Sequence, residues 1–275
     1  MFIAAAVLTL QMRGDTLRIA VVGDIGAGTR EIARGIEGVH RAAPLDAIVT
    51  TGDNVYPCGV KSAGDRHWDV LLPLLDLGIP IFPTLGNHDR CGNAQAEIGA
   101  PFPNWRFPAA QYVVHSAVAD FAMLDTTGFA GGRAPPPDID ALFEHSTAPW
   151  RIVAGHHPLL SSGYHGHLPR AEHRRMLTLI APMRQADVDL YMCGHDHHLE
   201  LIRDRPLMLI SGAGSEPVPP LLRHARTWWA NEGPAYRGFA VVQIGPRSMS
   251  IRFYDARGRA RSPVFQTPRA PRDGG

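Results

Sequence analysis

Short apolar runs alternate with polar loops along most of the chain. The runs are rich in Val, Ile and Leu and are short enough for buried strands. Between several of them, apolar residues recur every three or four positions, as they do on one face of an amphipathic helix. This alternation predicts an α/β fold. The expected strands cover residues 17–22, 46–50, 79–85, 120–126, 150–154, 189–193 and 206–211, and the expected helices cover 29–42, 65–77 and 170–186.

The pattern changes near the C-terminus. Residues 238–258 contain two stretches in which apolar and polar residues alternate, with a Gly-Pro pair between them. This predicts a β-hairpin, and therefore antiparallel as well as parallel strands. Residues 267–275 have too little apolar content to pack and are expected to be disordered. Because no repeat or linker divides the rest, residues 14–266 are expected to form one domain.

Residues 1–13 leave two alternatives open. They contain an apolar stretch of the length found in secretory signal peptides, but no Lys or Arg precedes it. The stretch is too short to span a bilayer as a helix. A leader peptide and an additional strand or frayed end are both compatible with this pattern. We expect no transmembrane segment elsewhere in the chain.

The charge balance limits the classes of partner. The formal net charge is +1, and the basic residues form no tract. The sequence therefore provides no strong field that would attract nucleic acid or an anionic membrane surface. We expect no nucleic-acid partner.

Candidate metal ligands follow five of the expected strands. In an open α/β sheet, functional side chains gather beyond the carboxyl ends of the strands. Each of the five loops begins with glycine, which permits a sharp turn of the backbone. The loops are "GDIG" with Asp24, "GDNVY" with Asp53 and Tyr56, "GNHD" with Asn87 and His88, "GHHP" with His156 and His157, and "GHDHH" with His195 and His197.

The five loops together predict a metal site, although each alone has an ordinary explanation as a turn or a cap. The glycines of "GDIGAG" do not have the spacing of a dinucleotide-binding loop, which excludes that interpretation. Carboxylate, imidazole, amide and phenol donors without thiolate suit iron, zinc or manganese. Seven such donors exceed what one ion takes, so we expect two ions that share a carboxylate.

The histidine cluster of "GHDHH" has a geometric explanation. His195 and His197 are two residues apart, so in a locally extended loop both side chains can face the metals while Asp196 points away. His198 is expected to line the pocket or to support a ligand rather than to lie on the surface. For His157 we expect a supporting role, such as orienting a neighbouring loop.

In this order the five loops resemble the calcineurin-like metallophosphoesterase superfamily. Tyr56 makes the chain similar to the purple acid phosphatases, and most of all to their small tartrate-resistant type. The similarity extends from about Leu17 to about Asp255 and includes "GNAQAEI", "FAMLDT", "STAPWRIVAGHHPL" and "LISGAGS". It implies an α/β fold, classed as α+β in some schemes. The expected architecture is a four-layer αββα sandwich of two mixed sheets, with the metal site at the carboxyl ends of the strands.

The resemblance also implies a role for each site residue. Asp53 would bridge the two ions. His88 and His165 would lie beside the phosphate and bind it or protonate the leaving oxygen, with His167 as the alternative to His165. The implied metals are Fe(3+) held by Asp24, Asp53, Tyr56 and His197, and Fe(2+), Zn(2+) or Mn(2+) held by Asp53, Asn87, His156 and His195.

The implied activity is hydrolysis of phosphomonoesters by attack of a metal-bound hydroxide, as in an acid phosphatase. The expected substrate is a small phosphoester, the product is inorganic phosphate, and the expected state is a monomeric catalytic domain. Phosphodiesterases, nucleotidases and pyrophosphatases use the same scaffold and remain alternatives. A catalytically silent binding scaffold is a further alternative, which the complete set of ligand residues disfavours.

The cysteines bear on the cellular compartment. Cys58 and Cys91 both follow candidate metal loops, so they could form a disulfide or remain two free thiols. Cys193 lies in an apolar run and is expected to be a small buried residue. A disulfide and a leader would suit a periplasmic or secreted protein, which we slightly favour over a cytoplasmic one.

Overall fold

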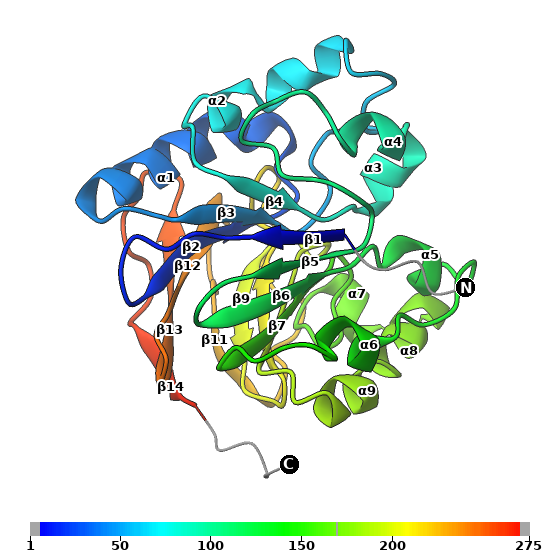
Figure 1. The fold of residues 1–275 in the computed structure, drawn as a ribbon, viewed down its shortest axis with the longest axis vertical. Helices are drawn as coiled ribbons and strands as arrows, with labels where there is room; N and C mark the ends of the chain where they lie inside the picture. The colour runs from blue at the N-terminus through cyan, green and yellow to red at the C-terminus, as the bar shows by residue number, and fades with distance from the viewer. Residues whose placement is uncertain (1–5, 169, 270–275) are drawn as a thin grey trace.

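A computed structural model describes residues 6–168 and 170–269. Within these ranges, two mixed β-sheets pack against each other and helices lie on the outer faces (Figure 1). The predicted α/β fold with two mixed sheets is confirmed. One sheet has the order β1 (Ala6–Thr9), β5 (Tyr112–His115), β6 (Ala119–Met123), β7 (Trp150–Ala154), β8 (Leu190–Cys193), β10 (Leu207–Ser211), β9 (Leu199–Ile202) and β11 (Thr227–Ala230). The other has the order β14 (Phe265–Pro268), β13 (Ser248–Asp255), β12 (Gly238–Ile244), β2 (Leu17–Val22), β3 (Ala47–Thr50) and β4 (Ile81–Pro83).

Parallel strands in both sheets end toward one region of the molecule. In the six-stranded sheet β2, β3 and β4 are parallel neighbours. In the eight-stranded sheet β6, β7 and β8 are parallel neighbours. The loops that leave these strands are therefore brought to a common edge, as expected for α/β sheets.

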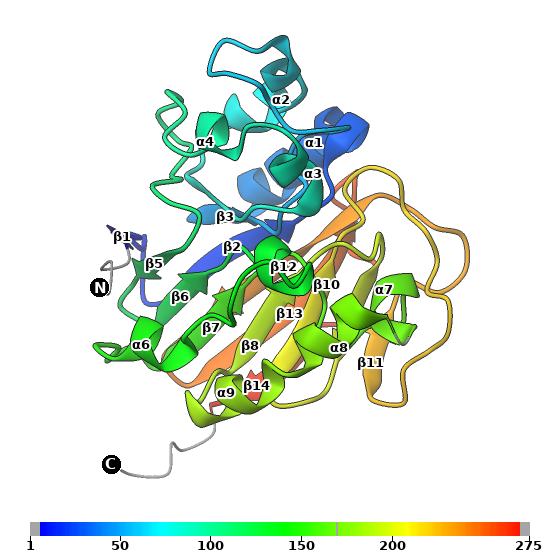
Figure 2. The same cartoon turned by 90° about the vertical axis from the view of Figure 1, so that its right-hand side faces the viewer.

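The helices are mostly short and cover the outside of the two sheets (Figure 2). Helix α1 begins at Thr29, as predicted, and buries Ile32, Ile36 and Val39 on one face. This spacing of three and four residues gives it an apolar stripe that packs against the six-stranded sheet. The helices are α1 (Thr29–Ala42), α2 (Leu72–Leu75), α3 (Asn87–Cys91), α4 (Ala94–Glu97), α5 (Thr127–Ala130), α6 (Ile139–Phe143), α7 (Tyr164–His167), α8 (Ala171–Leu177) and α9 (Ile180–Gln185).

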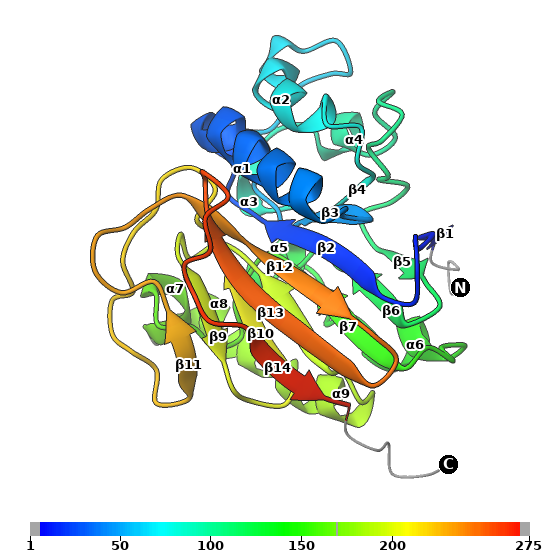
Figure 3. The same ribbon diagram turned by 90° about the vertical axis from the view of Figure 1, so that its left-hand side faces the viewer.

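Two apolar clusters hold the layers together. The larger lies between the sheets and extends to α1, and the smaller lies between the eight-stranded sheet and helices α5, α6, α8 and α9. Trp150 links the sheets directly, because its buried indole N–H donates to the carbonyl of Gly245 at 2.7 Å. Figure 3 shows the predicted hairpin, which consists of β12 and β13. The two strands pair along the whole of β12.

Two expected helices are interrupted, and in each case a proline explains the break. Residues 65–77 form a 3-10 helix (Arg66–Val70) followed by α2, which has Pro73 in its first turn. Residues 170–186 form α8 and α9 with a break before Pro182. Proline lacks an N–H and its ring clashes with the carbonyl four residues earlier, so neither expected helix can continue unbroken across the turn that precedes its proline.

Both ends of the chain contribute strands to the sheets. Ala6–Thr9 lies within residues 1–13, for which a leader peptide and an additional strand or frayed end were the alternatives. In the structure it forms strand β1, which pairs in parallel with β5. At the other end β14 reaches Pro268, two residues into the tail that we expected to be disordered. Residues 1–5, 169 and 270–275 lie outside the described part. In the described ranges, no helix has both the length and the apolar character that crossing a bilayer would require.

The structure answers the question that the cysteines left open. Cys58 and Cys91 form a disulfide that joins the loop after β3 to the end of α3. The first segment carries Asp53 and Tyr56 and the second begins at Asn87, so the disulfide holds two parts of the site together. Cys193 is buried, as predicted.

Candidate metal centre

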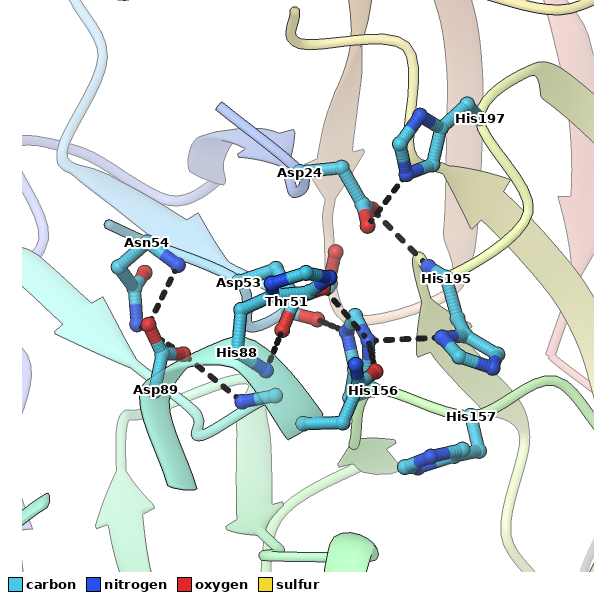
Figure 4. A network of polar contacts seen from close by, with 12 residues as sticks. Asp24, Thr51, Asp53, Asn54, His88, Asp89, His156, His157, His195 and His197 are labelled. Atoms are coloured by element: carbon cyan, nitrogen blue, oxygen red, sulfur yellow. Dashed lines mark hydrogen bonds and ion pairs between the residues drawn. The ribbon is translucent and has the colours of Figure 1, made fainter. Parts of the chain in front are cut away.

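Five loops from the two sheets converge on one cluster of polar side chains (Figure 4). Three of them leave β2, β3 and β4, and two leave β7 and β8. The structure brings together all seven residues that the sequence singled out as ligands. They are Asp24, Asp53, Tyr56, Asn87, His156, His195 and His197.

The first group of donors surrounds the phenol of Tyr56. The phenol oxygen lies 3.3 Å from Asp24 Oδ1 and 3.1 Å from Asp53 Oδ2. It also lies 3.4 Å from His197 Nε2, which is itself 3.3 Å from Asp24 Oδ1. Four potential ligand atoms thus face one another from three loops. Three of them are oxygens, the donor type that hard cations prefer.

The second group of donors surrounds the imidazole of His156. Its Nε2 lies 3.3 Å from Asp53 Oδ2, 3.1 Å from Asn87 Oδ1 and 3.0 Å from His195 Nδ1. Asp53 Oδ2 therefore belongs to both groups. The other oxygen of this carboxylate accepts the backbone N–H of His88 at 2.8 Å, which fixes the orientation of the shared oxygen.

Backbone carbonyls determine which ring nitrogen of two histidines faces the centre. His156 donates from Nδ1 to the carbonyl of Thr51 at 2.8 Å, and His197 donates from Nδ1 to the carbonyl of Glu216 at 3.0 Å. Each Nε2 is therefore left to face the donor groups, available as a ligand once it is deprotonated. Metal-binding histidines usually have such a partner on the other nitrogen, so this arrangement fits a metal centre.

The charges of the cluster also fit a cation. Although burial favours its neutral form, contact with His156 holds the pKa of Asp53 well below its usual range. Against the effect of burial, Asp53 raises the pKa of His156 to about 10, and Asp24 raises that of His197 to about 9. Burial and the two carboxylates raise the pKa of Tyr56. In the metal-free protein, protons on the imidazoles thus neutralise the charge of the carboxylates. Bound cations could take the place of these protons.

The backbone is strained at three of the candidate ligands. Asp24, Asp53 and His195 have positive φ values of 55°, 53° and 65°. Such conformations cost on the order of 1–3 kcal/mol each and concentrate at functional sites. Hydrogen bonds hold the strained residues in place, because Asp24 donates its N–H to Gly52 at 3.0 Å and His195 donates its N–H to Asp24 Oδ2 at 2.9 Å.

The glycines that precede the ligands have the expected role only in part, because Gly52, directly before Asp53, has a positive φ of 86°. The positive φ values of Asp24, Asp53 and His195 belong to the residue after the glycine, so at these loops the turn does not depend on glycine alone. At Gly86 the reason for glycine is lack of space, because an added Cβ atom would lie 2.0 Å from Asp53 Oδ1. Such a side chain would displace the shared carboxylate.

The predicted phosphate-binding histidines lie beside the two donor groups. The ring of His88 packs on Tyr56 with 4.4 Å between centroids, and its Nε2 is 4.0 Å from Asp53 Oδ2. The ring of His165 lies 3.9 Å from that of His195, and its buried Nδ1 has no hydrogen-bond partner within the described residues. The side chain of His167, the alternative to His165, is not among those described.

Buried carboxylates support these loops. Asp89, inside the "GNHD" loop, accepts the N–H of Gly86, and burial followed by Asp53 raises its pKa to about 7. Asp196 points away from the two donor groups and accepts the N–H of His165 at 2.9 Å. Motif position alone could have identified Asp89 as a candidate, because it closes a loop that already contains two site residues.

His198 is one of the supporting residues rather than a surface residue. Its side chain is buried, and Nε2 is 2.9 Å from a carboxylate oxygen of Glu200. Glu200 in turn accepts the backbone N–H of Ser162 at 2.8 Å, in the loop that leads to His165. The pair thus links the strand after the "GHDHH" loop to the segment that carries a predicted catalytic histidine.

Comparison with protein families agrees with this geometry. The sequence profile described as calcineurin-like phosphoesterase matches residues 17–199, which contain all seven candidate ligands. The chain belongs to the calcineurin-like phosphoesterase family. The predicted membership is confirmed, and as a phosphoesterase the protein is a hydrolase.

Curated relatives of this calcineurin-like phosphoesterase are acid phosphatases. It is 30% identical over 315 residues to tartrate-resistant acid phosphatase type 5 of Rattus norvegicus, covering 94% of this chain and 92% of that protein. It is 26% identical to purple acid phosphatase 4 of Arabidopsis thaliana, covering 89% of this chain and 82% of that protein. The predicted resemblance to the small tartrate-resistant type is thereby confirmed.

Solved structures agree on the fold of this phosphoesterase. GAP50, described as the anchor in the inner membrane complex of Plasmodium, matches with a TM-score of 0.80 and 23% identity over 94% of this chain and 91% of that one. A dimetal phosphatase from Danio rerio matches with a TM-score of 0.63 and 11% identity over 92% of this chain and 99% of that one. At these identities the likeness concerns the fold alone.

The substitution Gly86→Ala tests the close packing around the shared carboxylate. We expect it to lower the free energy of unfolding by about 3 kcal/mol, the upper end for overpacking at a rigid position. Gly38→Ala in α1 is the matched control, because outside the backbone of α1 itself nothing lies within 4 Å of its added Cβ. It should stabilise the protein by up to about 1 kcal/mol. Denaturant unfolding measures both, and equal stability of Gly86→Ala and wild type would contradict the packing argument.

The metal-free protein should lose stability as the pH rises from about 6.5 to about 10. The folded-state pKa of His156 is raised from 6.5 to about 10, so its ion pair with Asp53 contributes fully below the lower value and is lost through the higher one. Denaturant unfolding in chelator at about pH 6 and about pH 10 measures the loss. Asp53→Asn should flatten this dependence, and a wild-type stability that is independent of pH would show that the pair does not exist.

Proposed function

We propose that this phosphoesterase is a binuclear metal-dependent phosphatase that hydrolyses phosphomonoesters. The observation that supports the proposal most strongly is the shared oxygen of Asp53, which lies 3.1 Å from a donor of the first group and 3.3 Å from a donor of the second. A single carboxylate oxygen between two sets of ligands suits two ions close enough to act on one phosphate.

The composition of the two groups supports different metals. Asp24, Asp53 and Tyr56 can supply three anionic oxygens to the first ion, which suits Fe(3+). The second group has one carboxylate, which it shares, and neutral amide and imidazole donors, which suit Fe(2+), Zn(2+) or Mn(2+). The proposed ligands are Asp24, Asp53, Tyr56 and His197 for the first ion, and Asp53, Asn87, His156 and His195 for the second.

When bound, the two ions would acidify a water molecule for attack on phosphorus and neutralise the charge of the phosphate. The residues of the chain orient the reaction around them. His88 donates from Nδ1 to the carbonyl of Pro57 at 2.6 Å, which leaves Nε2 toward the centre. The backbone N–H of His165 is anchored on Asp196 at 2.9 Å. We assign both side chains to binding the phosphate or giving a proton to the leaving oxygen.

The strained backbone favours an enzyme over a catalytically silent scaffold. Three candidate ligands have positive φ, which costs stability that a binding scaffold would gain by relaxing. The same scaffold could serve a phosphodiesterase, a nucleotidase or a pyrophosphatase, so the assay should include aryl and alkyl monoesters, a diester, a nucleotide and pyrophosphate. The proposal expects the monoesters to have the highest kcat/KM.

The substitution Asp53→Asn should abolish hydrolysis and leave fewer than two metal ions per chain. Asp46→Asn is the matched control, because Asp46 is a buried carboxylate at the opposite end of β3. It should retain both metals and turnover. His88→Ala should retain both metals and lose turnover by about 100-fold or more, the usual contribution of a general acid or base. Full activity of Asp53→Asn would refute the proposal.

Tyr56→Phe should remove a visible absorption band without unfolding the protein. A phenolate bound to Fe(3+) absorbs visible light by charge transfer, so iron-containing wild-type protein should be coloured. Tyr112→Phe is the control, because its phenol is buried elsewhere and donates to the carbonyl of Pro83. Metal analysis and absorption spectra of the three proteins decide the matter. A colourless wild type with two Zn(2+) or Mn(2+) would remove the ferric assignment and leave the phosphatase.

A further inference from the structure

A carboxylate on α8 lies against one of the proposed ligands. Glu172 Oε1 is 3.1 Å from His195 Nε2, and the Glu172 side chain is 36% exposed, so it closes the outer side of this imidazole. Glu172 belongs to none of the five loops that carry the ligands. Nothing in the sequence motifs assigns it a function.

The hydrogen bonds of His195 require its two nitrogens to have different roles. Nδ1 faces the second donor group, 3.0 Å from His156 Nε2. To bind a cation there, Nδ1 must present a lone pair, so the ring proton must be on Nε2. The Nε2–H then donates to Glu172. A carboxylate in this position fixes the ring orientation and increases the basicity of the ligand nitrogen.

A second imidazole faces the same carboxylate. Thr126 Oγ1 accepts the backbone N–H groups of His156 and His157, each at 3.2 Å. Both lone pairs of the hydroxyl are then used, so its proton must go to His157 Nδ1, which is 2.8 Å away. The proton of His157 is therefore on Nε2, 3.8 Å from Glu172 Oε1.

This assignment excludes another interpretation of the same residues. The ligand atoms of His157, Glu172 and His195 lie within 4.8 Å of one another and could be taken for a further metal site. With a proton on Nε2, however, His157 has no lone pair to offer on that side. The carboxylate instead receives the N–H of His195 and faces that of His157 at the longer distance of 3.8 Å.

Ring packing restricts His195 further. Its centroid is 3.9 Å from that of His165 and 4.5 Å from that of His157. The two neighbouring rings limit its position, but tilted ring contacts of this kind do not choose between its two tautomers. A polar partner at Nε2 can do so, and Glu172 is the one that the described residues provide at this nitrogen.

We propose that Glu172 is a positioning residue that holds His195 with Nδ1 toward the second metal ion, supported by the Thr126–His157 pair. The inference rests on the proposed function, because it assigns His195 as a ligand. Glu172 touches neither substrate nor metal in this account. Its loss should therefore weaken one of two metal ions and affect hydrolysis only through that ion.

The test compares Zn(2+) binding to metal-free wild type, Glu172→Ala, Glu172→Gln and the control Glu144→Ala, an exposed glutamate at the end of α6. Calorimetric titration should resolve two sites in the wild type. We expect Glu172→Ala to weaken one of them by about 10–100-fold, the usual effect of losing such a partner. Glu172→Gln retains an acceptor oxygen and should lose less, and the control should match wild type.

Nitrogen NMR of His195 in the Zn(2+)-loaded protein gives a readout that a merely structural role would not change. The wild type should show a slowly exchanging proton on Nε2, and in Glu172→Ala that proton should exchange rapidly because its acceptor is gone. Unchanged affinities in both Glu172 variants, or equal weakening of both sites, would overturn the inference. If the wild type binds no metal, the proposed function fails and the inference fails with it. The titration separates this outcome from a binding defect that is confined to the Glu172 variants.

Discussion

One oxygen atom, Oδ2 of Asp53, imposes the main geometric constraint on this structure. It lies 3.1 Å from the phenol oxygen of Tyr56 and 3.3 Å from His156 Nε2, and so belongs to two groups of donors, each of which combines residues from both sheets. For both groups to reach it, the parallel strands of the two sheets must end in one place. The packing of the sheets through Trp150 and the large apolar core therefore determines the site as well as the stability of the fold.

The convergence of the loops requires locally unfavourable backbone conformations, and hydrogen bonds to buried polar groups offset their free-energy cost. Positive φ at Asp24, Asp53 and His195 is unfavourable by itself. Asp89 compensates on one side by receiving the N–H of Gly86, and Asp196 does so on the other by receiving the N–H of His165. Such interactions define one arrangement of the ligands rather than many. A preorganised arrangement of this kind favours metal binding and catalysis because little has to move.

The sequence was sufficient to predict the strands and loops that carry the centre. The exits of β2, β3, β4, β7 and β8 combine a short apolar run with a glycine and a donor, and this local pattern is visible without coordinates. Strands β5, β9, β11 and β14 were missed because their runs are short, and β1 lies in a segment for which a strand was one of two alternatives. The breaks in two expected helices followed from proline, whose effect outweighed the apolar periodicity.

Contacts between distant segments could not be predicted in this way. The pairing of Cys58 with Cys91 depends on how two loops approach each other, which their separation of 33 residues does not reveal. Glu172 is a further case, because it lies on an ordinary amphipathic helix and meets His195 only through the packing of α8 on the sheet. The reason for glycine at position 86 is likewise a contact with Asp53 that only the fold creates.

The central claim is that two cations share the carboxylate of Asp53. The most direct test is a crystal structure of the metal-loaded protein with anomalous scattering recorded at the absorption edges of iron, zinc and manganese. The account predicts two anomalous peaks, roughly 3.5–4 Å apart as in other two-metal sites, with Asp53 Oδ2 between them. A single peak, or two peaks that do not share this oxygen, would contradict it.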